Sequence, residues 1–335
     1  MDLTTIWFAL IAILWVGYFV LEGFDFGVGM LLPFLGHGDR ERRALINTIG
    51  PVWDGNEVWV LVAGGATFAA FPEWYATLFS GFYLALFLIL VTLIIRGVAF
   101  EFRSKRPEPA WRSRWDLAIF VGSLLPAFLW GVAFANIVQG VPINAQHQFT
   151  GDLFTLLNPY GLLGGLTLVA LFLTHGAVFL ALKTAGDLRR RANALAGRLG
   201  LAAAVVAVVF LAWTQLIRGG PGSLALSVVA AVALVGALAA NRLGREGWAF
   251  IGSAVTIALA VASLFVGLFP NVMPSSLDAA YSLTTTNAAS TSYTLTIMTW
   301  VAVIFTPLVL VYQGWTYWVF RRRISAESVP ASEGY

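Results

Sequence analysis

The sequence predicts an all-α integral membrane protein with about nine transmembrane helices. Of its 335 residues, 59% are hydrophobic and 11% are charged, whereas a soluble domain carries about 25% charged residues. The mean hydropathy is +0.81, and apolar runs long enough to cross a hydrocarbon core of about 30 Å recur along the chain. The ten-residue alternation that is typical of transmembrane β-strands does not occur in the sequence.

The apolar runs give the expected spans in chain order. The first is long and contains glycines at 23, 27 and 29, which allow close helix approach. The second begins at Pro51, a residue favoured at helix starts, and the others are apolar runs bounded by charged or polar loops. The nine expected spans are 6–35, 51–71, 75–100, 115–137, 158–182, 199–217, 223–241, 248–270 and 294–320.

The loops between these spans differ sharply in charge. Eighteen of the twenty Lys and Arg residues fall in alternate loops, at 36–50, 101–114, 183–198, 242–247 and after 320. Since basic loops stay in the cytoplasm, this pattern predicts the N-terminus outside and the C-terminus inside. The sequence pI of about 9.3 arises from these loops, so we expect a membrane lipid environment and no nucleic-acid partner.

A short internal repeat predicts two similar units. GDRERRA begins at Gly38 and GDLRRRA begins at Gly186, each after a span. Four helices per unit would make the two units parallel, with an axis along the membrane normal. The expected division is a first four-helix unit with the acidic residues at 1–137, an outer loop at 138–157, a second unit at 158–270, an outer loop at 271–293, and a ninth helix with a cytoplasmic tail at 294–335.

Four carboxylates lie within or beside the first two spans. Glu22 and Asp25 form one pair, and Asp54 and Glu57 form the other. Spacing of i,i+3 places each pair on one helix face. Acidic residues at membrane depth are costly, and they usually mark proton, ion or substrate paths. Antiparallel packing of the two spans predicts a hydrated acidic cluster in the cytoplasmic half.

Each pair also has a purely structural interpretation. Asp25 could be satisfied by a hydroxyl on a neighbouring helix within a small-residue packing face. Asp54 and Glu57 could be solvated acids that favour the N-terminal end of the helix dipole. Arg96 is a basic residue within a span; it could extend to the interface, or it could pair with one of the acids or with an anionic cofactor group.

Histidine and cysteine usage limits the redox chemistry of this chain. His175 lies within a span, His37 and His147 lie in loops, and the chain has no cysteine. A thiolate metal site is therefore excluded. A bis-histidine haem or a haem–copper centre needs more histidines within the membrane than this chain supplies. We expect no metal ligated by this chain.

Longer motifs carry a resemblance to a known family. They are GFDFGVGMLLPFLG, NTIGPVWDGNEVWVLVAGGATFAAFP, FSGFY, FRSK, GVAFANIVQGVP, LNPYGLLGG, FPNVMPSS and LTIMTWVAV. The chain resembles subunit II of the cytochrome bd quinol oxidases from residue 17 to about residue 317. WDGNEVW with GFD upstream is the most specific of these motifs. One departure is Glu57, where some members have glutamine.

The resemblance implies a multi-pass protein of the bacterial cytoplasmic membrane. It implies a heterodimer with subunit I, which would carry two b-type haems, a d-type haem and the quinol site. The implied reaction oxidises quinol and reduces O2 to water, electrogenically and without proton pumping. A small single-helix accessory subunit and a structural quinone or lipid are further expectations from the family.

The resemblance also gives roles to residues of this chain. Asp25 and Asp54 match the family's acidic pathway positions, and we expect protons to pass from Asp54 along Asp25 and Glu22. Glu57 belongs to the same expected pathway, and Arg96 could hold an acid or a haem propionate. Two alternatives stay open at this point. One is a purely structural partner subunit without a proton role, and the other is a secondary transporter.

Overall fold

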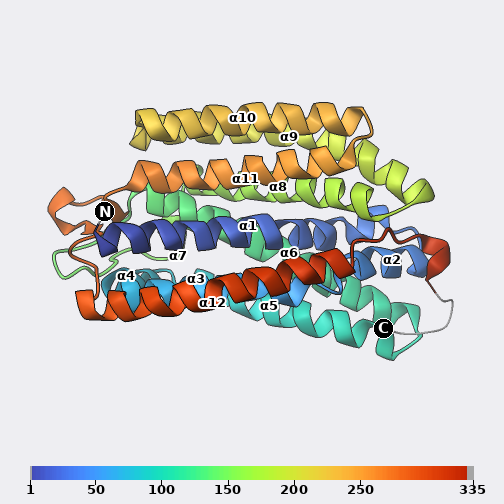
Figure 1. Ribbon diagram of the computed structural model, residues 1–335, viewed down its shortest axis with the longest axis horizontal. Helices are drawn as coiled ribbons and strands as arrows, with labels where there is room; N and C mark the ends of the chain where they lie inside the picture. The colour runs from blue at the N-terminus through green and yellow to red at the C-terminus, as the bar shows by residue number, and fades with distance from the viewer. Residues whose placement is uncertain (1, 330–335) are drawn as a thin grey trace.

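The computed structural model describes residues 2–329 as a bundle of long helices. The helices and strands are α1 (Leu3–Leu35), α2 (Asp39–Ile49), α3 (Trp53–Ala70), α4 (Pro72–Gly81), α5 (Tyr83–Phe102), η1 (Arg103–Lys105), α6 (Pro109–Gln139), α7 (Leu153–Leu156), α8 (Pro159–Lys183), α9 (Gly186–Arg218), α10 (Pro221–Arg242), α11 (Glu246–Leu268), β1 (Asn271–Met273), η2 (Ala279–Tyr281), β2 (Leu283–Thr284), α12 (Ser292–Val319) and η3 (Ala326–Ser328). In Figure 1, α9 and α10 form one flank, and α3, α5 and α12 form the other. Helices α1, α6, α8 and α11 lie between these flanks and contact one another.

The helices confirm the predicted all-α, multi-pass class. Eight of the described helices are long and apolar enough to cross a membrane: α1, α5 with η1, α6 and α8 to α12. Helix α3 is not among these eight. It has 18 residues, and its first turns carry Asp54, Asn56 and Glu57. The structure therefore supports eight to nine spans.

The predicted span at 75–100 was wrong in its continuity, because two helices occupy this region. Helix α3 ends before Pro72, which opens α4 at a position where its missing N–H costs nothing. Helices α4 and α5 meet at Phe82, whose backbone angles are φ −100° and ψ 16°. A hydrogen bond from the Leu86 N–H to the Phe82 carbonyl continues across this junction.

Two segments that were expected to be loops contain regular structure. In the basic loop 36–50, α2 is an amphipathic helix that buries Leu45, Ile46 and Ile49. In the loop 271–293, β1 and β2 form a short antiparallel hairpin. Both elements lie at an end of the bundle. Figure 1 shows α2 at the end opposite to the N-terminus.

Ion pairs connect residues of all five basic loops, which shows that these loops lie at the same end of the bundle. The distances between charged atoms are 2.9 Å for Arg103–Asp39, 2.6 Å for Arg191–Glu41, 2.5 Å for Arg189–Glu246 and 3.6 Å for Arg323–Glu246. Segments that the charge pattern assigns to one side of a membrane thus share one face of the fold.

The contacts of Glu41 predict that the stability of the fold depends on pH. Partial burial opposes the charge of Glu41, but hydrogen bonds from Arg191 and from the backbone N–H of His37 lower its pKa below the usual range. A lowered pKa adds stability that is complete above the unfolded value of about 4.3 and disappears as the pH falls through the folded value. Glu41→Gln should lower the free energy of unfolding by about 1 kcal/mol at neutral pH. Melting temperatures of wild type and variant should converge below about pH 4, and a constant difference would contradict the pairing.

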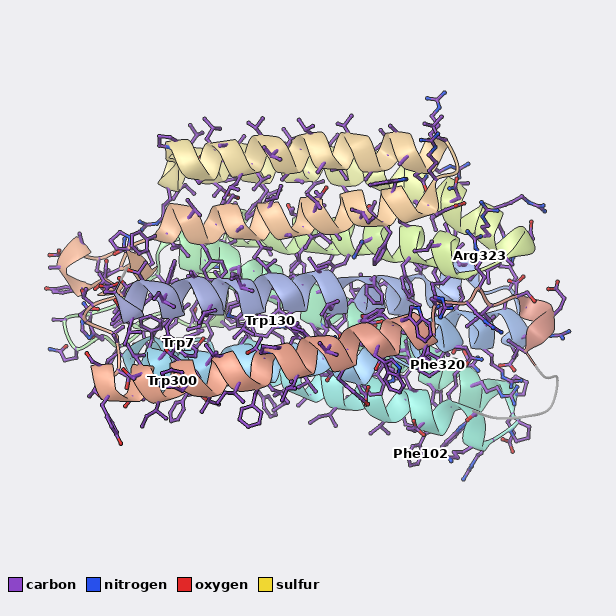
Figure 2. All side chains as sticks on the ribbon, in the orientation of Figure 1. Trp7, Phe102, Trp130, Trp300, Phe320 and Arg323 are labelled. Atoms are coloured by element: carbon purple, nitrogen blue, oxygen red, sulfur yellow. The ribbon has the colours of Figure 1, made fainter. Side chains whose placement is uncertain are left out.

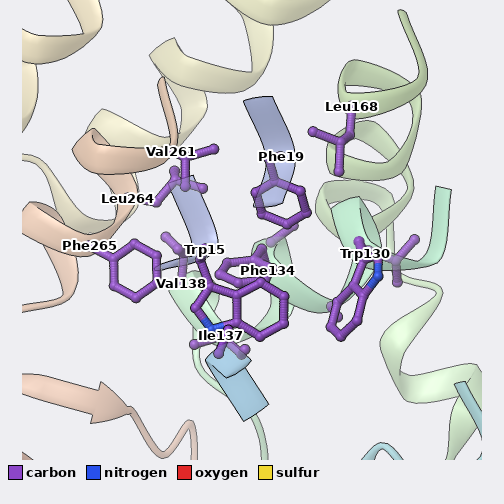
Figure 3. Packing of buried hydrophobic residues seen from close by; sticks show 14 of the residues in the cluster. Trp15, Phe19, Trp130, Phe134, Ile137, Val138, Leu168, Val261, Leu264 and Phe265 are labelled. Carbon is purple, nitrogen blue, oxygen red and sulfur yellow. The ribbon is translucent and has the colours of Figure 1, made fainter. Parts of the chain in front are cut away.

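The core is built from aromatic side chains of the central helices. Figure 3 shows Trp15 and Phe19 of α1 against Trp130 and Phe134 of α6. The ring centroids of Trp15 and Trp130 are 4.8 Å apart, and those of Trp15 and Phe134 are 4.9 Å apart, both edge to face. This geometry is favourable for aromatic pairs, and it fixes α1 against α6 next to the acidic residues of α1.

Helices α1 and α8 cross at two glycines. A Cβ atom on Gly27 would lie 2.8 Å from the Gly176 Cα atom, and one on Gly176 would lie 2.6 Å from the Gly27 Cα atom. Backbone thus packs directly on backbone, as small residues permit in membrane helices. This crossing holds the C-terminal half of α1, which carries Glu22 and Asp25, against α8.

Helix α12 packs at the edge of the bundle, against α1 and α3. Among its described residues, Leu295 is its one buried side chain. Trp7 of α1 donates from Nε1 to the Leu295 carbonyl at 3.2 Å and to the Thr299 hydroxyl at 3.1 Å. Figure 2 places Trp7 near this end of α12 and Phe320 at its other end. Few apolar contacts therefore hold α12, and polar contacts fix its position.

Candidate functional site

An arginine and two glutamates form a buried ion cluster between α1, α3 and α5. Arg96 donates from Nη1 to Oε1 of Glu22, and both side chains are fully buried. The same Nη1 atom lies 3.7 Å from Oε2 of Glu57, whose side chain is 23% exposed. One guanidinium therefore joins the first acidic pair to the second.

Aromatic rings enclose the guanidinium of Arg96. Its Cζ atom lies 4.7 Å from the ring centroid of Phe26, 5.5 Å from that of Phe100 and 5.9 Å from that of Trp53. These distances allow cation–π attraction in a desolvated setting. Of the alternatives open for Arg96, extension to the interface is wrong, because the residue is fully buried and pairs with an acid.

Asp25 belongs to a second group of polar side chains. Its Oδ2 atom accepts a hydrogen bond from Nδ2 of Asn56 at 2.6 Å, and both residues are fully buried. Oδ1 of Asn56 accepts from the hydroxyl of Tyr317 at 2.8 Å and from Nε2 of Gln313 at 3.1 Å. Helices α1, α3 and α12 thus meet at one amide, and no hydroxyl of a packing face satisfies Asp25 among the described residues.

The two acids of α3 differ in exposure. Asp54 is exposed, and its Oδ1 atom accepts from the backbone N–H of Gly55 at 2.6 Å. Glu57, one turn later, reaches Arg96. Asp54 is thus exposed at the start of α3 and lies outside the ion cluster, whereas Glu22 and Asp25 are buried in α1.

Several buried polar atoms of this region have no hydrogen-bond partner among the described residues. They are Oε2 of Glu22, Oδ1 of Asp25, Oε2 of Glu57, Nε and Nη2 of Arg96 and the hydroxyl of Tyr18. Unsatisfied buried polar groups are rare in proteins, and they are commonly met by ordered water. Their concentration on one string of side chains distinguishes this region from the ordinary helix contacts of the bundle.

His175 joins three helices through both ring nitrogens. Nε2 lies 3.2 Å from the Val20 carbonyl of α1, and Nδ1 lies 2.7 Å from the hydroxyl of Ser253 in α11. Its ring stacks on Phe250, with centroids 4.7 Å apart. Since a carbonyl accepts only, the contact with Val20 assigns a proton to Nε2. Both ring nitrogens of His175 thus contact other helices, and no cluster of three metal-binding side chains occurs within residues 2–329.

An apolar cavity lies on the other side of the core. Its volume is about 50 Å³, and its lining includes Phe19, Phe134, Leu168, Val261 and Leu264, which Figure 3 shows converging. Ligand pockets usually have volumes of about 300 Å³ or more. The cavity therefore gives no support to a quinone site, which stays a prediction from the family resemblance.

Sequence reasoning missed three polar residues of the site: Asn56, Gln313 and Tyr317. Asn56 lies between Asp54 and Glu57 in the motif WDGNEVW, and it carries no charge that would mark it at membrane depth. Gln313 and Tyr317 have i,i+4 spacing near the end of the last span, where polar and aromatic residues are common at the membrane interface. Their shared helix face was the available signal.

Comparisons with known proteins agree with one another. Residues 3–320 match the family model of cytochrome bd terminal oxidase subunit II. The chain is 44% identical to the cytochrome bd ubiquinol oxidase subunit 2 of Bacillus subtilis, over 97% of both chains. It is 40% identical to the cytochrome bd-I ubiquinol oxidase subunit 2 of Escherichia coli, over 97% of this chain and 96% of that one.

A solved structure shares the fold. A chain in the structure of the bd oxidase from Geobacillus thermodenitrificans superposes with a TM-score of 0.78 at 20% identity, covering 96% of this chain and 99% of that one. The secondary-transporter alternative is thereby wrong, since full-length relatives at 40–44% identity are oxidase subunits. This chain belongs to the family of subunit II of the cytochrome bd terminal oxidases, a multi-pass bacterial membrane subunit of a quinol:O2 oxidoreductase.

Proposed function

We propose that this subunit supplies a proton route from the end with the basic loops to subunit I. Protons enter near the exposed Asp54, pass along Asp25 and Glu22, and leave toward the partner, with Glu57 and Arg96 beside the route. The observation that carries the proposal is the string of buried carboxyl oxygens that have no hydrogen-bond partner among the described residues. Water on this string would connect the acids.

The charge of the site favours proton sharing. Glu22, Asp25 and Glu57 face the single guanidinium of Arg96. Full ionisation would leave two uncompensated negative charges in a largely buried volume, which costs several kcal/mol per ion. Interacting acids of this kind titrate as a group. We therefore propose that the cluster holds protons at neutral pH and exchanges them among its members.

The direction of uptake follows from the proposed topology. The ion-paired basic loops lie at one end, near the exposed Asp54 at the start of α3. The positive-inside rule assigns that end to the cytoplasm, with the N-terminus outside and the C-terminus inside. Consumption of cytoplasmic protons makes the oxidase electrogenic without pumping.

We propose the division into two four-helix units, 1–137 and 158–270, from the internal repeat that begins at Gly38 and Gly186. Helices pack within each unit and also between the units, where α8 contacts both α1 and α6. In the first unit α1 packs on α3 and α6, and in the second α8 packs on α9 and α11. α1 and α8 pack on each other, as equivalent helices beside a twofold axis would. The ninth helix and tail (294–335) and the outer loops 138–157 and 271–293 complete the division, and the tail beyond 329 lies outside the described residues.

We assign the haems and the quinol site to the partner. The hydrogen bonds of His175 leave this chain without a free membrane imidazole, so two b-type haems and a d-type haem fit subunit I. The haems supply electron transfer and O2 reduction, and this chain's residues hold and move protons. A single-helix accessory subunit and bound lipid or quinone remain proposals from the family.

The proposal predicts that Asp25→Asn lowers quinol-driven oxygen uptake of the complex about tenfold or more, because an amide cannot relay a proton. Asp54→Asn should have a smaller effect, since water can reach the route around an exposed residue. Haem content from reduced-minus-oxidised spectra serves as the assembly check. Glu108→Gln, an exposed acid at the same end, is the control.

A purely structural role is the second candidate, favoured by the ion pair of Arg96 with Glu22. It predicts that Asp25→Asn keeps full turnover in complexes with full haem content. That result would contradict the proposed proton route.

A further inference from the structure

We infer that Gln313 and Tyr317 are positioning residues that fix the Asn56 amide, so that Asp25 exchanges its proton at Oδ1. The inference rests on the proposed proton role of Asp25. Gln313 and Tyr317 come from α12, at one helical turn's spacing, and both reach Asn56 of α3. No sequence motif of the acidic pairs includes them.

The indole N–H of Trp59 fixes the orientation of the Gln313 amide. Trp59 donates from Nε1 to Oε1 of Gln313 at 3.0 Å. An indole nitrogen only donates, so the atom of Gln313 that faces it is the oxygen. Nε2 of Gln313 therefore points the other way, toward Asn56.

The orientation of Asn56 follows in turn. Nε2 of Gln313 only donates, so the atom of Asn56 at 3.1 Å from it is Oδ1. Nδ2 of Asn56 must then face α1, where it donates to Oδ2 of Asp25 at 2.6 Å and lies 3.4 Å from the Leu21 carbonyl. A carbonyl accepts only, which supports the same orientation.

This chain of donors gives the two oxygens of Asp25 different roles. Oδ2 of Asp25 accepts the hydrogen bond from the Asn56 amide. A proton on Oδ2 would face this N–H donor, and the hydrogen bond would be lost. Oδ1 is buried and has no partner among the described residues. A proton carried by Asp25 therefore resides on Oδ1, and an inverted amide would move it to Oδ2.

The packing of α12 makes this arrangement testable. Leu295 is the one buried side chain among the described residues of α12, and Trp7 anchors that end of the helix. Gln313 and Tyr317 lie toward the opposite end. Substitutions at the two ends thus separate the attachment of α12 from the orientation of Asn56.

The test uses the complex of this chain with its subunit I. The variant Gln313→Leu/Tyr317→Phe removes both donors to Asn56, and Thr299→Val/Tyr312→Phe is the matched control on α12. Redox-difference infrared spectra report the Asp25 carboxyl band, identified by its loss in Asp25→Asn. We expect the band to shift and turnover to fall about three- to tenfold in the first variant, with unchanged haem content. The control weakens the contact of α12 with Trp7, so its melting temperature should fall, while its carboxyl band and its turnover per haem should match wild type.

Single variants sharpen the result. Tyr317→Phe keeps the obligate donor Gln313, so its band should stay in place. Gln313→Leu should shift the band, and it carries the test should the double variant fail to assemble. An unchanged band and turnover in Gln313→Leu, with full haem content, overturn the positioning role. Full turnover of Asp25→Asn overturns the proton role itself, which is a separate result.

Discussion

Arg96→Met should destabilise the complex more than substitution of any other basic residue of this chain. The guanidinium is fully buried against Glu22 and lies 3.7 Å from Glu57. Removing one partner of a buried ion pair leaves an uncompensated charge and typically costs about 3–5 kcal/mol. We expect a large fall in melting temperature and in the yield of haem-loaded complex, measured by thermal unfolding in detergent and by haem spectra.

Two further variants separate charge from packing. Glu22→Gln/Arg96→Met removes both charges of the closer pair and should recover part of the lost stability, because Glu22 is no longer left as an unpaired buried charge while Glu57 still loses its partner. Arg106→Met changes an exposed arginine at the basic end and should alter stability by less than about 0.5 kcal/mol. If Arg96→Met melts like wild type, the ion cluster does not hold α1 to α5.

Gly176→Val should prevent the close crossing of α8 and α1. A Cβ atom at this position would meet the Cα atom of Gly27 at 2.6 Å, and backbone cannot rotate away as a side chain can. Overpacking costs about 1–3 kcal/mol where side chains can adjust, so this substitution should cost at least about 3 kcal/mol. Thermal unfolding and the yield of assembled complex measure the effect.

Gly236→Val in α10 is the matched control. No atom of another residue packed against α10 lies within 4 Å of a Cβ built on Gly236, so the added side chain would point into open space at the outer flank of the bundle. Its melting temperature should stay near that of wild type. Equal losses for both variants would mean that general helix effects, and not the crossing, set the cost.

The sequence predicted the membrane class and the shared end of the basic loops, because hydropathy and charge sorting follow directly from bilayer physics. It missed α2, because 11 residues with a short apolar stripe lie below the length of a span. It also missed the junction at Phe82, since apolar residues continue through it and hydrogen bonding hardly changes.

The acids and Arg96 were predictable because charges at membrane depth are exceptional. Their connections were not predictable. Asn56, Gln313 and Tyr317 are neutral residues, and the contacts of Asn56 with Gln313 and Tyr317 join positions more than 250 residues apart. Single-sequence patterns carry no information on such distant pairs, so only the folded bundle brings α12 to Asp25.

Proton uptake during turnover tests the proposed route most directly. The complex is reconstituted in one orientation into vesicles, and the proton consumption and membrane potential that accompany quinol oxidation are followed for wild type and Asp25→Asn. We predict uptake from the side of the basic loops in wild type, and a slowed potential-generating phase with normal haem reduction in Asp25→Asn. Identical uptake and potential in the two complexes would contradict a proton route through Asp25.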